Sequence, residues 1–474
     1  MQLVAMAVAA DAVAMLERAW AVSCYGVLNR PVGVVNVMVM VVMILLGAGV
    51  AVVFRVLRRR REVYLVDYGC FLGEPCHRVT FAMALEHGRL MKNLVDEEST
   101  NFMVRLYERS GIGEETSVPD SMRYLPPERG IEASREEAEL VVFSAVDKVL
   151  ARTGLRPEDI DTLIVACSFT TPTPSFTDVV VNRYSFRADV RSVNLSGMGC
   201  SGALIAIGLA KNLLNAGPPG KRVLIVATEI LSSMFYTGTK REMLVPNVLF
   251  RMGAASMILS NSPENARFRL GPIVRTLTAA KDSDYRCAFQ EEDDDGITGI
   301  NLSKDLPVVA ANALKGHLVA FGLAVALSFL NHKLIKLRMS SVRAEEAAAA
   351  GGCYRPGFHN LFQHFCIHPG GRRVLHEVQR GLALTDADME ASHMTLHRFG
   401  NMASSSLLYE LAYIEAKDRM RKGDRHYRKT PGIDCSSVVW ECVKPPPPSH
   451  LDNGPWAGCI HRYPVQLPKI IKRA

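Results

Sequence analysis

The sequence has little of what marks several large classes of protein. Its 35 glycines and 24 prolines are ordinary numbers for 474 residues, which excludes collagen-like and low-complexity chains. Aromatic residues make up only 7%, but 48% of the residues are apolar, so the chain is not intrinsically disordered. A chain of this length predicts about three domains or one large fused fold.

No Cys-x-x-Cys pair occurs among the 11 cysteines, and their number is odd. A chain this large can form a core without disulfide bonds, so scattered thiols indicate a reducing compartment. Any cysteine that carries a function is therefore expected to act as a free thiol.

Excess positive charge is absent from most of the chain. The net charge is +7, and residues 1–61 contribute most of it through seven arginines against two acidic residues. The remaining residues hold 48 basic and 46 acidic side chains. Because a nucleic-acid-binding domain is expected to carry a basic face, this near-neutral body predicts no nucleic-acid partner.

Charged side chains are also missing from Val32–Phe54, a segment of 23 residues. A helix of that length reaches about 35 Å, enough for a hydrocarbon core of about 30 Å. Arg55 and Arg58–Arg61 follow directly, and such a cluster stays on the cytoplasmic side. We expect residues 1–61 to form a membrane anchor, with the rest of the chain in the cytosol. An apolar stretch within residues 1–29 predicts either an interfacial helix or a weak first span.

From residue 62 onward, strand-like and helical segments alternate. Ser134 and Glu137 have the spacing of a capping box, before a helix that is expected to end at Gly154. Strands are predicted at 160–167, 189–195, 221–230 and 364–368, and later helices near 372–381 and 403–420. This alternation predicts a layered α/β body.

Cys200 is the residue best placed for covalent chemistry. It stands between Gly199 and Gly202, after a predicted strand and before an apolar helix. A helix N-terminus stabilises a thiolate by at most about 2 kcal/mol. Lowering a thiol pKa from about 8.5 to about 6 takes roughly 3.4 kcal/mol. A cationic partner is therefore needed, and histidine is the usual one.

Two other interpretations of this segment stay open from the residues alone. A cysteine in a glycine-rich turn can be a small buried apolar residue. Gly197, Gly199 and Gly202 also have the spacing of a dinucleotide-binding fingerprint, with Glu229 as its acidic partner. Glu229, however, lies 27 residues past the last glycine, whereas the fingerprint expects about 20.

Histidines are concentrated late in the chain. His364/His368 and His393/His397 are H-x-x-x-H pairs, which bind metal when they lie on a helix. Together with a membrane span they raise the alternative of a di-iron desaturase or hydroxylase. The segment 364–368 is strand-like and is followed by Pro-Gly-Gly, and one clear span cannot build a multi-helix intramembrane site. We therefore expect no metal site.

The body as a whole resembles plant 3-ketoacyl-CoA synthases, condensing enzymes of very-long-chain fatty acid elongation in the thiolase-like superfamily. The matching stretches include VYLVDYGC (63–70), GIGEET (111–116), PTPS (172–175), NLSGMGCSG (194–202), LVPNVLFRMG (244–253), YRCAFQEEDDDG (285–296), NLSKDL (301–306), HFCIHPGGR (364–372), MTLHRFGN (394–401) and YELAYIEAK (409–417). They extend over most of the chain, from about Val63 to Asp424.

The resemblance implies a fold and a set of site residues. The fold is a thiolase-like α/β fold of two similar βαβαβαββ halves, 62–265 and 266–474, usually in a homodimer. Cys200 becomes the nucleophile of a Cys-His-Asn triad completed by His368 and Asn401. The resemblance matches His364 and His397 to further histidines of the family, and these two residues and Gly199 are expected to support the site.

It also implies an activity. Cys200 would accept the acyl group of a long-chain acyl-CoA, and malonyl-CoA would lose CO₂ and attack that thioester to release 3-ketoacyl-CoA. No metal, flavin or nicotinamide cofactor is implied. The implied surroundings are the endoplasmic reticulum membrane, with the body facing the cytosol, and the elongase-complex reductases and dehydratase, in pathways such as that of cuticular wax.

The sequence departs from the family in two regions. The family has a Gly-rich loop, roughly G-x-G-F-K-C-N-S, where this chain has RKTPGIDCSS with only Gly432 ahead of Cys435. Residues 316–360 also diverge, and we expect them to affect the acyl tunnel. These departures keep open a catalytically weak paralogue that acts as a scaffold of the elongase complex. A chalcone-synthase-like polyketide enzyme is disfavoured by the predicted anchor and by the context of Cys200.

Overall fold

The computed structural model describes residues 62–91, 95–331, 361–430, 432 and 434–467, without the side chains of residues 323 and 326–331. The predicted span Val32–Phe54 and the stretch 1–29 lie outside these residues. Among the helices that the structure describes, none is both long and apolar enough to cross a membrane.

Nine strands of the described body are hydrogen-bonded in the order β11-β12-β13-β8-β1-β7-β6-β4-β5. In chain order they are β1 (Tyr64–Cys70), β4 (Thr162–Ala166), β5 (Arg191–Leu195), β6 (Arg222–Glu229), β7 (Gly253–Ser260), β8 (Phe268–Leu277), β11 (His364–Ile367), β12 (Arg425–Thr430) and β13 (Asp434–Cys442). The strands predicted at 160–167, 189–195, 221–230 and 364–368 are confirmed as β4, β5, β6 and β11.

The helices around these strands have the following bounds: α5 (Ile131–Thr153), α6 (Phe176–Tyr184), α7 (Gly202–Ala216), α10 (Leu306–Asn331), α12 (Arg372–Leu382), α13 (Asp386–Phe399), α14 (Ser406–Ala416) and α15 (Pro448–Asp452). Further elements are α3 (Phe81–Leu90), α4 (Glu97–Ser110), α8 (Arg241–Leu249), α9 (Asp282–Tyr285), β2 (Arg78–Val79), β3 (Thr116–Ser117), β9 (Ala288–Glu292) and β10 (Thr298–Leu302).

The strand order repeats itself. The series β4-β6-β7-β1 corresponds to β11-β12-β13-β8: in each, the first pair is parallel and the next two pairs are antiparallel. The two series meet where β1 pairs with β8. The sheet is thus built from one pattern used twice, which confirms the predicted α/β class.

The second series lacks one strand that the first one has. The first follows βαβαβαββ with β5 at its outer edge, and no counterpart of β5 occurs among the described residues of the second. The segment before α14 pairs instead with the first half, since Asn401 forms a bridge with Phe250. Its backbone groups are therefore already bound and cannot extend the second sheet.

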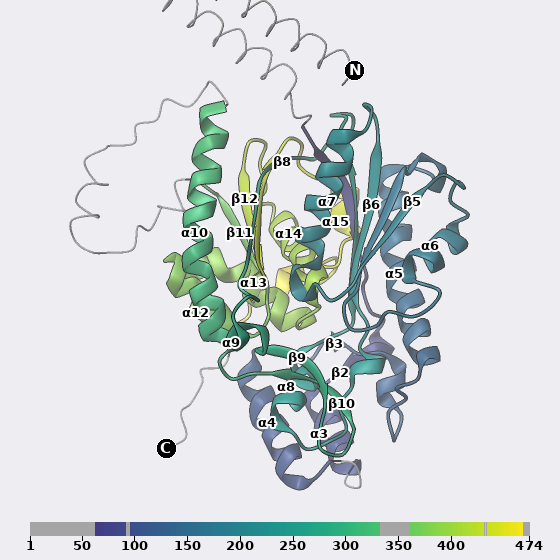
Figure 1. Cartoon of the computed structure of the whole chain (residues 1–474), viewed down its shortest axis with the longest axis vertical. Helices are drawn as coiled ribbons and strands as arrows, with labels where there is room; N and C mark the ends of the chain where they lie inside the picture. The colour runs from purple at the N-terminus through teal and green to yellow at the C-terminus, as the bar shows by residue number, and fades with distance from the viewer. Residues whose placement is uncertain (1–61, 92–94, 332–360, 431, 433, 468–474) are drawn as a thin grey trace, which may run out of the picture. The chain divides into compact units, whose positions relative to one another are not determined.

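Helices and the two halves of the nine-stranded sheet alternate in five layers (Figure 1). α10 covers β8 and β13 on one side, and α5 covers β1 and β7 on the other. α7 and α14 lie in the middle: α7 contacts β4, β6 and β13, and α14 contacts β11, β1 and β7. Because strands of both halves of the sheet contact α7, the helix is buried over most of its surface, as its nearly all-round apolar sequence predicts.

The start of α5 differs from the prediction. The helix begins at Ile131 after Gly130, so Ser134 lies inside its first turn and donates to the Gly130 carbonyl. Glu137 is buried and accepts hydrogen bonds from the backbone of Leu231 and Ser232. Ser134 and Glu137 therefore do not form a capping box. Glu137 instead makes a contact with residues far along the chain, which the local sequence does not show.

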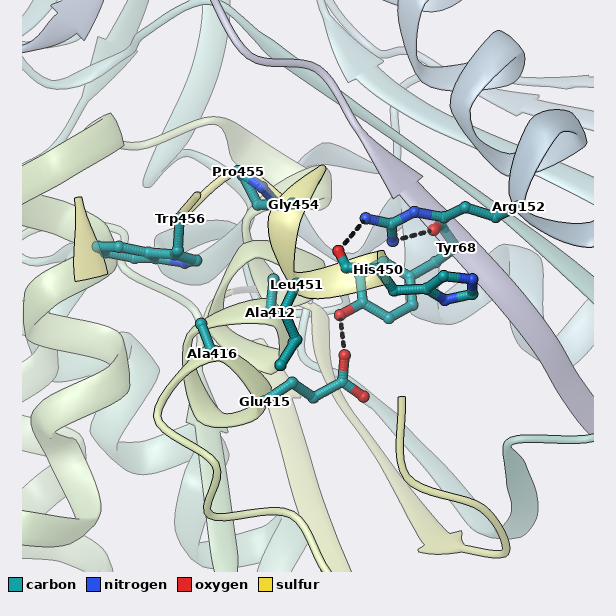
Figure 2. Close-up of a pocket in the computed structure, with 10 residues that line it drawn as sticks. All are labelled: Tyr68, Arg152, Ala412, Glu415, Ala416, His450, Leu451, Gly454, Pro455 and Trp456. Atoms are coloured by element: carbon teal, nitrogen blue, oxygen red, sulfur yellow. Dashed lines mark hydrogen bonds between the residues drawn. The ribbon is translucent and has the colours of Figure 1, made fainter. Parts of the chain in front are cut away.

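A small pocket marks a junction between the two halves (Figure 2). Tyr68 Oη donates to Glu415 Oε2 at 2.6 Å, and Arg152 donates to the carbonyls of Tyr68 and His450 at 2.9 and 2.8 Å. Arg267 pairs with Glu415 from the other side. The volume of about 10 Å³ holds one water at most, so this is a structural joint and no substrate site.

Candidate active site

Cys200 lies in a tight turn that opens α7. Residues Gly199–Ser201 form a 3-10 turn, and α7 continues from Gly202. Gly197 and Gly199 have φ of +70° and +54°, a left-handed conformation that glycine adopts without a steric cost. The Gly199 N–H donates to Ser168 Oγ at 2.8 Å, which ties the turn to the end of β4. Gly199 thus shapes the backbone next to Cys200.

α7 reaches this position because its first residue has no side chain. A Cβ on Gly202 would lie 3.2 Å from the Ala166 Cβ and 3.7 Å from the Ser404 Cβ. Cys200 itself is half-buried and packs against a cluster that includes Phe250 and Ala403. The turn is therefore held between the first half and the segment that carries Asn401.

His368 follows the last residue of β11. Its N–H donates to the Lys429 carbonyl at 2.9 Å, which continues the pairing of β11 with β12. The side chain is 2% exposed, and neither ring nitrogen has a hydrogen-bond partner among the described residues. A buried imidazole with two unpartnered nitrogens leaves hydrogen-bonding capacity that a substrate can use.

Asn401 lies between α13 and α14 and is 3% exposed. Its N–H donates to the Leu249 carbonyl at 3.1 Å, and its carbonyl accepts from Arg251 N–H at 2.9 Å. Its side-chain Oδ1 accepts from Ala403 N–H at 2.9 Å. This bond fixes the carboxamide orientation, and Nδ2 donates to the Gly370 carbonyl at 3.5 Å.

Contacts between the halves bring the turn of Cys200 to the end of β12. Ser201 Oγ lies 2.7 Å from Thr430 Oγ1 and donates to the Asp434 carbonyl at 2.8 Å. Thr430 is next to Lys429, the backbone partner of His368. Asn401 enters the same region through its bridge with Phe250, a member of the apolar cluster against which Cys200 packs. The structure therefore gathers the three predicted residues at the carboxyl ends of the parallel strands of both halves.

Burial controls the protonation of this site. It raises the pKa of the Cys200 thiol to about 12, with the charge of Glu229 as a smaller cause in the same direction. It lowers the pKa of His368 to about 3. At neutral pH the free site thus holds a neutral thiol and a neutral imidazole. Desolvation thus acts against the thiolate that the partial charge of the helix favours.

Glu229, which the sequence offered as a ribose-binding residue, is instead a buried carboxyl behind the nucleophile turn. It accepts from the N–H groups of Ser168 and Phe169 at 3.0 Å. Burial raises its pKa to about 7, although these hydrogen bonds act in the opposite direction. The dinucleotide interpretation is therefore wrong, since the carboxylate faces protein backbone.

Ser168 and Thr430 were missed by the sequence analysis. One accepts from the Gly199 N–H and the other contacts Ser201, so both fix the turn of Cys200. The signal for Ser168 was its place directly after a predicted strand, at the edge where Cys200 was expected. Nothing local marks Thr430, because its contact joins residues 229 positions apart.

His364 and His397, the two histidines that were expected to support the site, make other contacts. His364 is at the first residue of β11, and its Nε2 lies 3.0 Å from Asp424 Oδ2. Four residue steps along the strand separate it from His368, a distance of about 13 Å. His397, near the end of α13, packs against the backbone of Gly113, where a Cβ would lie 2.6 Å from the ring. Both histidines thus have structural contacts, and the structure gives His364 no place beside Cys200.

The histidine pairs form no metal site in the described part of the chain, where no group of three His, Cys, Asp or Glu side chains is arranged to hold an ion. His364 and His368 lie on and just after a strand, as predicted, so their rings do not share a helix face. His393 faces His376 instead, with ring centroids 5.6 Å apart.

Two solved structures show the fold of this chain. The 1,3,6,8-tetrahydroxynaphthalene synthase of Streptomyces coelicolor A3(2) matches with a TM-score of 0.62 and 21% identity, over 80% of this chain and 99% of its own. A CsyB mutant complexed with CoA-SH matches with a TM-score of 0.62 and 20% identity, over 80% of this chain and 100% of its own. These matches confirm the thiolase-like α/β fold.

Sequence comparison identifies the family. A model described as FAE1/type III polyketide synthase-like protein matches residues 55–334, and one for the C-terminal domain of chalcone and stilbene synthases matches residues 302–435. 3-Ketoacyl-CoA synthase 6 of Arabidopsis thaliana is 45% identical over 87% of this chain and 82% of its own length. 3-Ketoacyl-CoA synthase 5 of the same plant is 43% identical over 87% and 83%. With this similarity spanning both halves, the chain belongs to the family of 3-ketoacyl-CoA synthases.

Proposed function

We propose that the protein condenses malonyl-CoA with a long-chain acyl-CoA to give a 3-ketoacyl-CoA, with Cys200, His368 and Asn401 as its catalytic residues. The observation that carries the proposal is the contact of Ser201 with Thr430, because it joins the nucleophile turn of one half to the strand beside His368 in the other. The 45% identity to a named 3-ketoacyl-CoA synthase supports the same activity.

The first half-reaction loads the acyl group. Cys200 Sγ attacks the thioester carbonyl as its proton passes to His368, and CoA leaves with that proton as a free thiol. Each ion alone is disfavoured by burial, but the thiolate and the imidazolium form together and attract each other strongly in a site of low dielectric. The proton transfer therefore accompanies substrate binding and does not precede it.

The second half-reaction forms the carbon–carbon bond. Malonyl-CoA loses CO₂, and its thioester oxygen takes the negative charge of the enolate. Neutral His368 and the Asn401 amide can each donate a hydrogen bond to that oxygen, the electrostatic contribution that such sites depend on. The enolate carbon then attacks the acyl-Cys200 thioester, and the departing thiolate recovers a proton from solvent. These residues carry both half-reactions without a metal, flavin or nicotinamide.

The test is condensation in microsomes that contain the full chain, with labelled malonyl-CoA and a panel of long-chain acyl-CoAs. We expect labelled 3-ketoacyl-CoA from the native protein and none from Cys200→Ala. Cys442→Ala is the matched control, since it removes a buried thiol at the far end of β13 and is expected to keep the activity.

The alternative, a catalytically weak scaffold, is not favoured by the match to named synthases over 87% of the chain. Folded native protein that gives no product with any acyl-CoA would revive it. The stretch 430–436, with its single glycine, is the first place to examine in that case.

We further propose the setting of the reaction. The apolar span Val32–Phe54 and its arginines support an anchor in the endoplasmic reticulum membrane, with the body in the cytosol. β5 is the outermost strand of the first half, and its free edge supports pairing with a second copy in a homodimer. The keto group of the product supports association with the reductases and dehydratase of an elongase complex.

A further inference from the structure

Arg251 is a buried cation near Asn401 that the proposed reaction does not use. It follows Phe250, the residue that ends α8, and is 3% exposed. Within the described part of the chain, its guanidinium pairs with no carboxylate. Burying a charge without an opposite charge costs free energy, so the other contacts of Arg251 must offset that cost.

These contacts tie the end of α8 to β3. Arg251 Nε donates to Thr116 Oγ1 at 2.9 Å, and Thr116 is the first residue of β3. Nη1 donates to the carbonyls of Phe250 and Asn247 at 2.7 and 3.4 Å. Both carbonyls belong to the C-terminal end of α8, where the helix dipole favours a positive charge. The guanidinium therefore holds the segment 249–251 in one place.

The same segment carries the backbone of Asn401. The Arg251 N–H donates to the Asn401 carbonyl at 2.9 Å, and the Asn401 N–H donates to the Leu249 carbonyl at 3.1 Å. Both backbone groups of Asn401 thus bind the segment that the guanidinium holds. A shift of residues 249–251 would shift Asn401 with them.

Gly400, the residue before Asn401, lies against the Arg251 side chain. Its φ is +74°, and a Cβ there would lie 2.9 Å from Arg251 Cβ and still closer to Arg251 Cγ. Only a glycine leaves room for this approach and adopts this φ without strain. The stem of Arg251 therefore covers the backbone that leads into Asn401.

We propose that Arg251 is the positioning residue that places the Asn401 amide for its hydrogen bond to the malonyl-CoA enolate. The inference rests on the proposed function, in which this amide stabilises the enolate oxygen. A donor is effective only at the place where the charge develops, and a misplacement of 1 Å can cost about 100-fold in rate. Arg251 needs no contact with substrate, because it acts through residues 249–251 and Gly400.

The test is Arg251→Met in the full chain, which keeps most of the stem over Gly400 and removes the guanidinium. Loading of Cys200 is followed by mass spectrometry of the acyl-enzyme, and condensation by product formation from labelled malonyl-CoA. We expect condensation to fall about 10–100-fold and loading to change by less than about threefold. Arg251→Lys keeps the charge and should restore part of the loss. An equal fall of loading and condensation would overturn the inference.

A double-variant cycle tests whether Arg251 acts through Asn401. Asn401→Asp removes the amide donor, so Arg251→Met then has no donor left to misplace. In the Asn401→Asp background we expect Arg251→Met to lower condensation by less than about twofold. Losses that multiply in the double variant would show that Arg251 acts independently of Asn401, and would overturn the inference as well.

The matched control is Arg152→Met. Arg152 also donates to two backbone carbonyls, those of Tyr68 and His450, but in the joint between the halves (Figure 2). This variant should lose thermal stability and keep the native ratio of condensation to loading. If Arg251→Met does not fold, Thr116→Val takes its place in both measurements, because it removes the acceptor of Nε and keeps the arginine. Its expected fall in condensation is about threefold to tenfold.

Failure of this inference is distinguishable from failure of the proposed function. Folded native protein without product, or Asn401→Asp that loses loading and condensation alike, would contradict the proposed function. Active native protein and selective loss of condensation in Asn401→Asp, together with multiplied losses in the double variant, would overturn only the role of Arg251.

Discussion

The two halves of the protein present the same turn at the same place and use it differently. Gly199–Ser201 precedes α7, and Ala403–Ser405 precedes α14, and each helix contacts strands of both halves of the sheet. The first residue of each turn is left-handed, with φ of +54° at Gly199 and +47° at Ala403. The middle residue is Cys200 in one half and Ser404 in the other.

This difference shows that the fold supplies two equivalent positions and the side chains decide which one reacts. Ser404 is 2% exposed, and its hydroxyl has no hydrogen-bond partner among the described residues. A hydroxyl without a base is a weak nucleophile. Cys200 is half-buried, and the contact of Ser201 with Thr430 brings it to the strand beside His368.

The largest expected effect comes from making the two turns alike. Cys200→Ser places a hydroxyl in the turn of α7, as at Ser404. We expect condensation to fall by at least about a thousandfold, because a hydroxyl is far less acidic than a thiol and is a poorer leaving group for the second half-reaction. Product formation from labelled malonyl-CoA measures this. Activity within tenfold of the native protein would contradict the role of Cys200.

A smaller effect is expected from a substitution that impairs the second half-reaction and leaves the first, the loading of Cys200, largely intact. Asn401→Asp keeps the size and the acceptor for Ala403 N–H but removes the amide donor. We expect condensation to fall about 10²–10³-fold, the value of one donor to an oxyanion. Loading of Cys200, followed by mass spectrometry of the acyl-enzyme, should be much less affected. Equal loss of both half-reactions would contradict the assignment of Asn401 to decarboxylation.

Glu229 makes the stability of the first half dependent on pH. Burial raises its pKa from 4.5 to about 7, so the folded state holds a proton that the unfolded state releases above pH 4.5. Stability is therefore highest below that pH and falls as the pH rises to about 7. Glu229→Gln should remove roughly 3 kcal/mol of this loss, measured by denaturant unfolding at pH 5 and pH 8. An unchanged slope would mean that Glu229 is ionised throughout.

The smallest effects test the backbone of the two turns. Gly199→Ala should destabilise the protein by only about 1 kcal/mol, because a left-handed alanine is strained but a Cβ there would contact nothing within 4 Å. Ala403→Gly should relieve the same strain in the other turn. Thermal unfolding of both variants measures the difference. A loss of folding in Gly199→Ala would show that the two turns are not equivalent.

Much of this molecule could be predicted from local sequence. Short apolar segments between helical ones predicted the strands β4, β6 and β11. The small residues around Cys200 predicted a turn before an apolar helix. Such patterns are reliable because they report which face of an element is buried. The roles of His368 and Asn401 came from family resemblance, since neither residue has a local signature of catalysis.

Other features could not be predicted from the local sequence. Glu137 has the spacing of a helix cap but binds the backbone of Ser232, and His364 shares a motif with His368 but pairs with Asp424. In each case the deciding contact joins segments far apart in the chain. Sequence spacing carries no information on such contacts, because they form only when the layers pack.

The sequence by itself determined which residues of this protein can do chemistry: a free thiol flanked by glycines, a histidine after a strand, and an amide before a helix. Only the tertiary structure decided their protonation and their surroundings. The layers that bring Cys200 and His368 into one region also remove water from them, and this desolvation raises the pKa of the thiol and lowers that of the imidazole, so it disfavours the charged form of each.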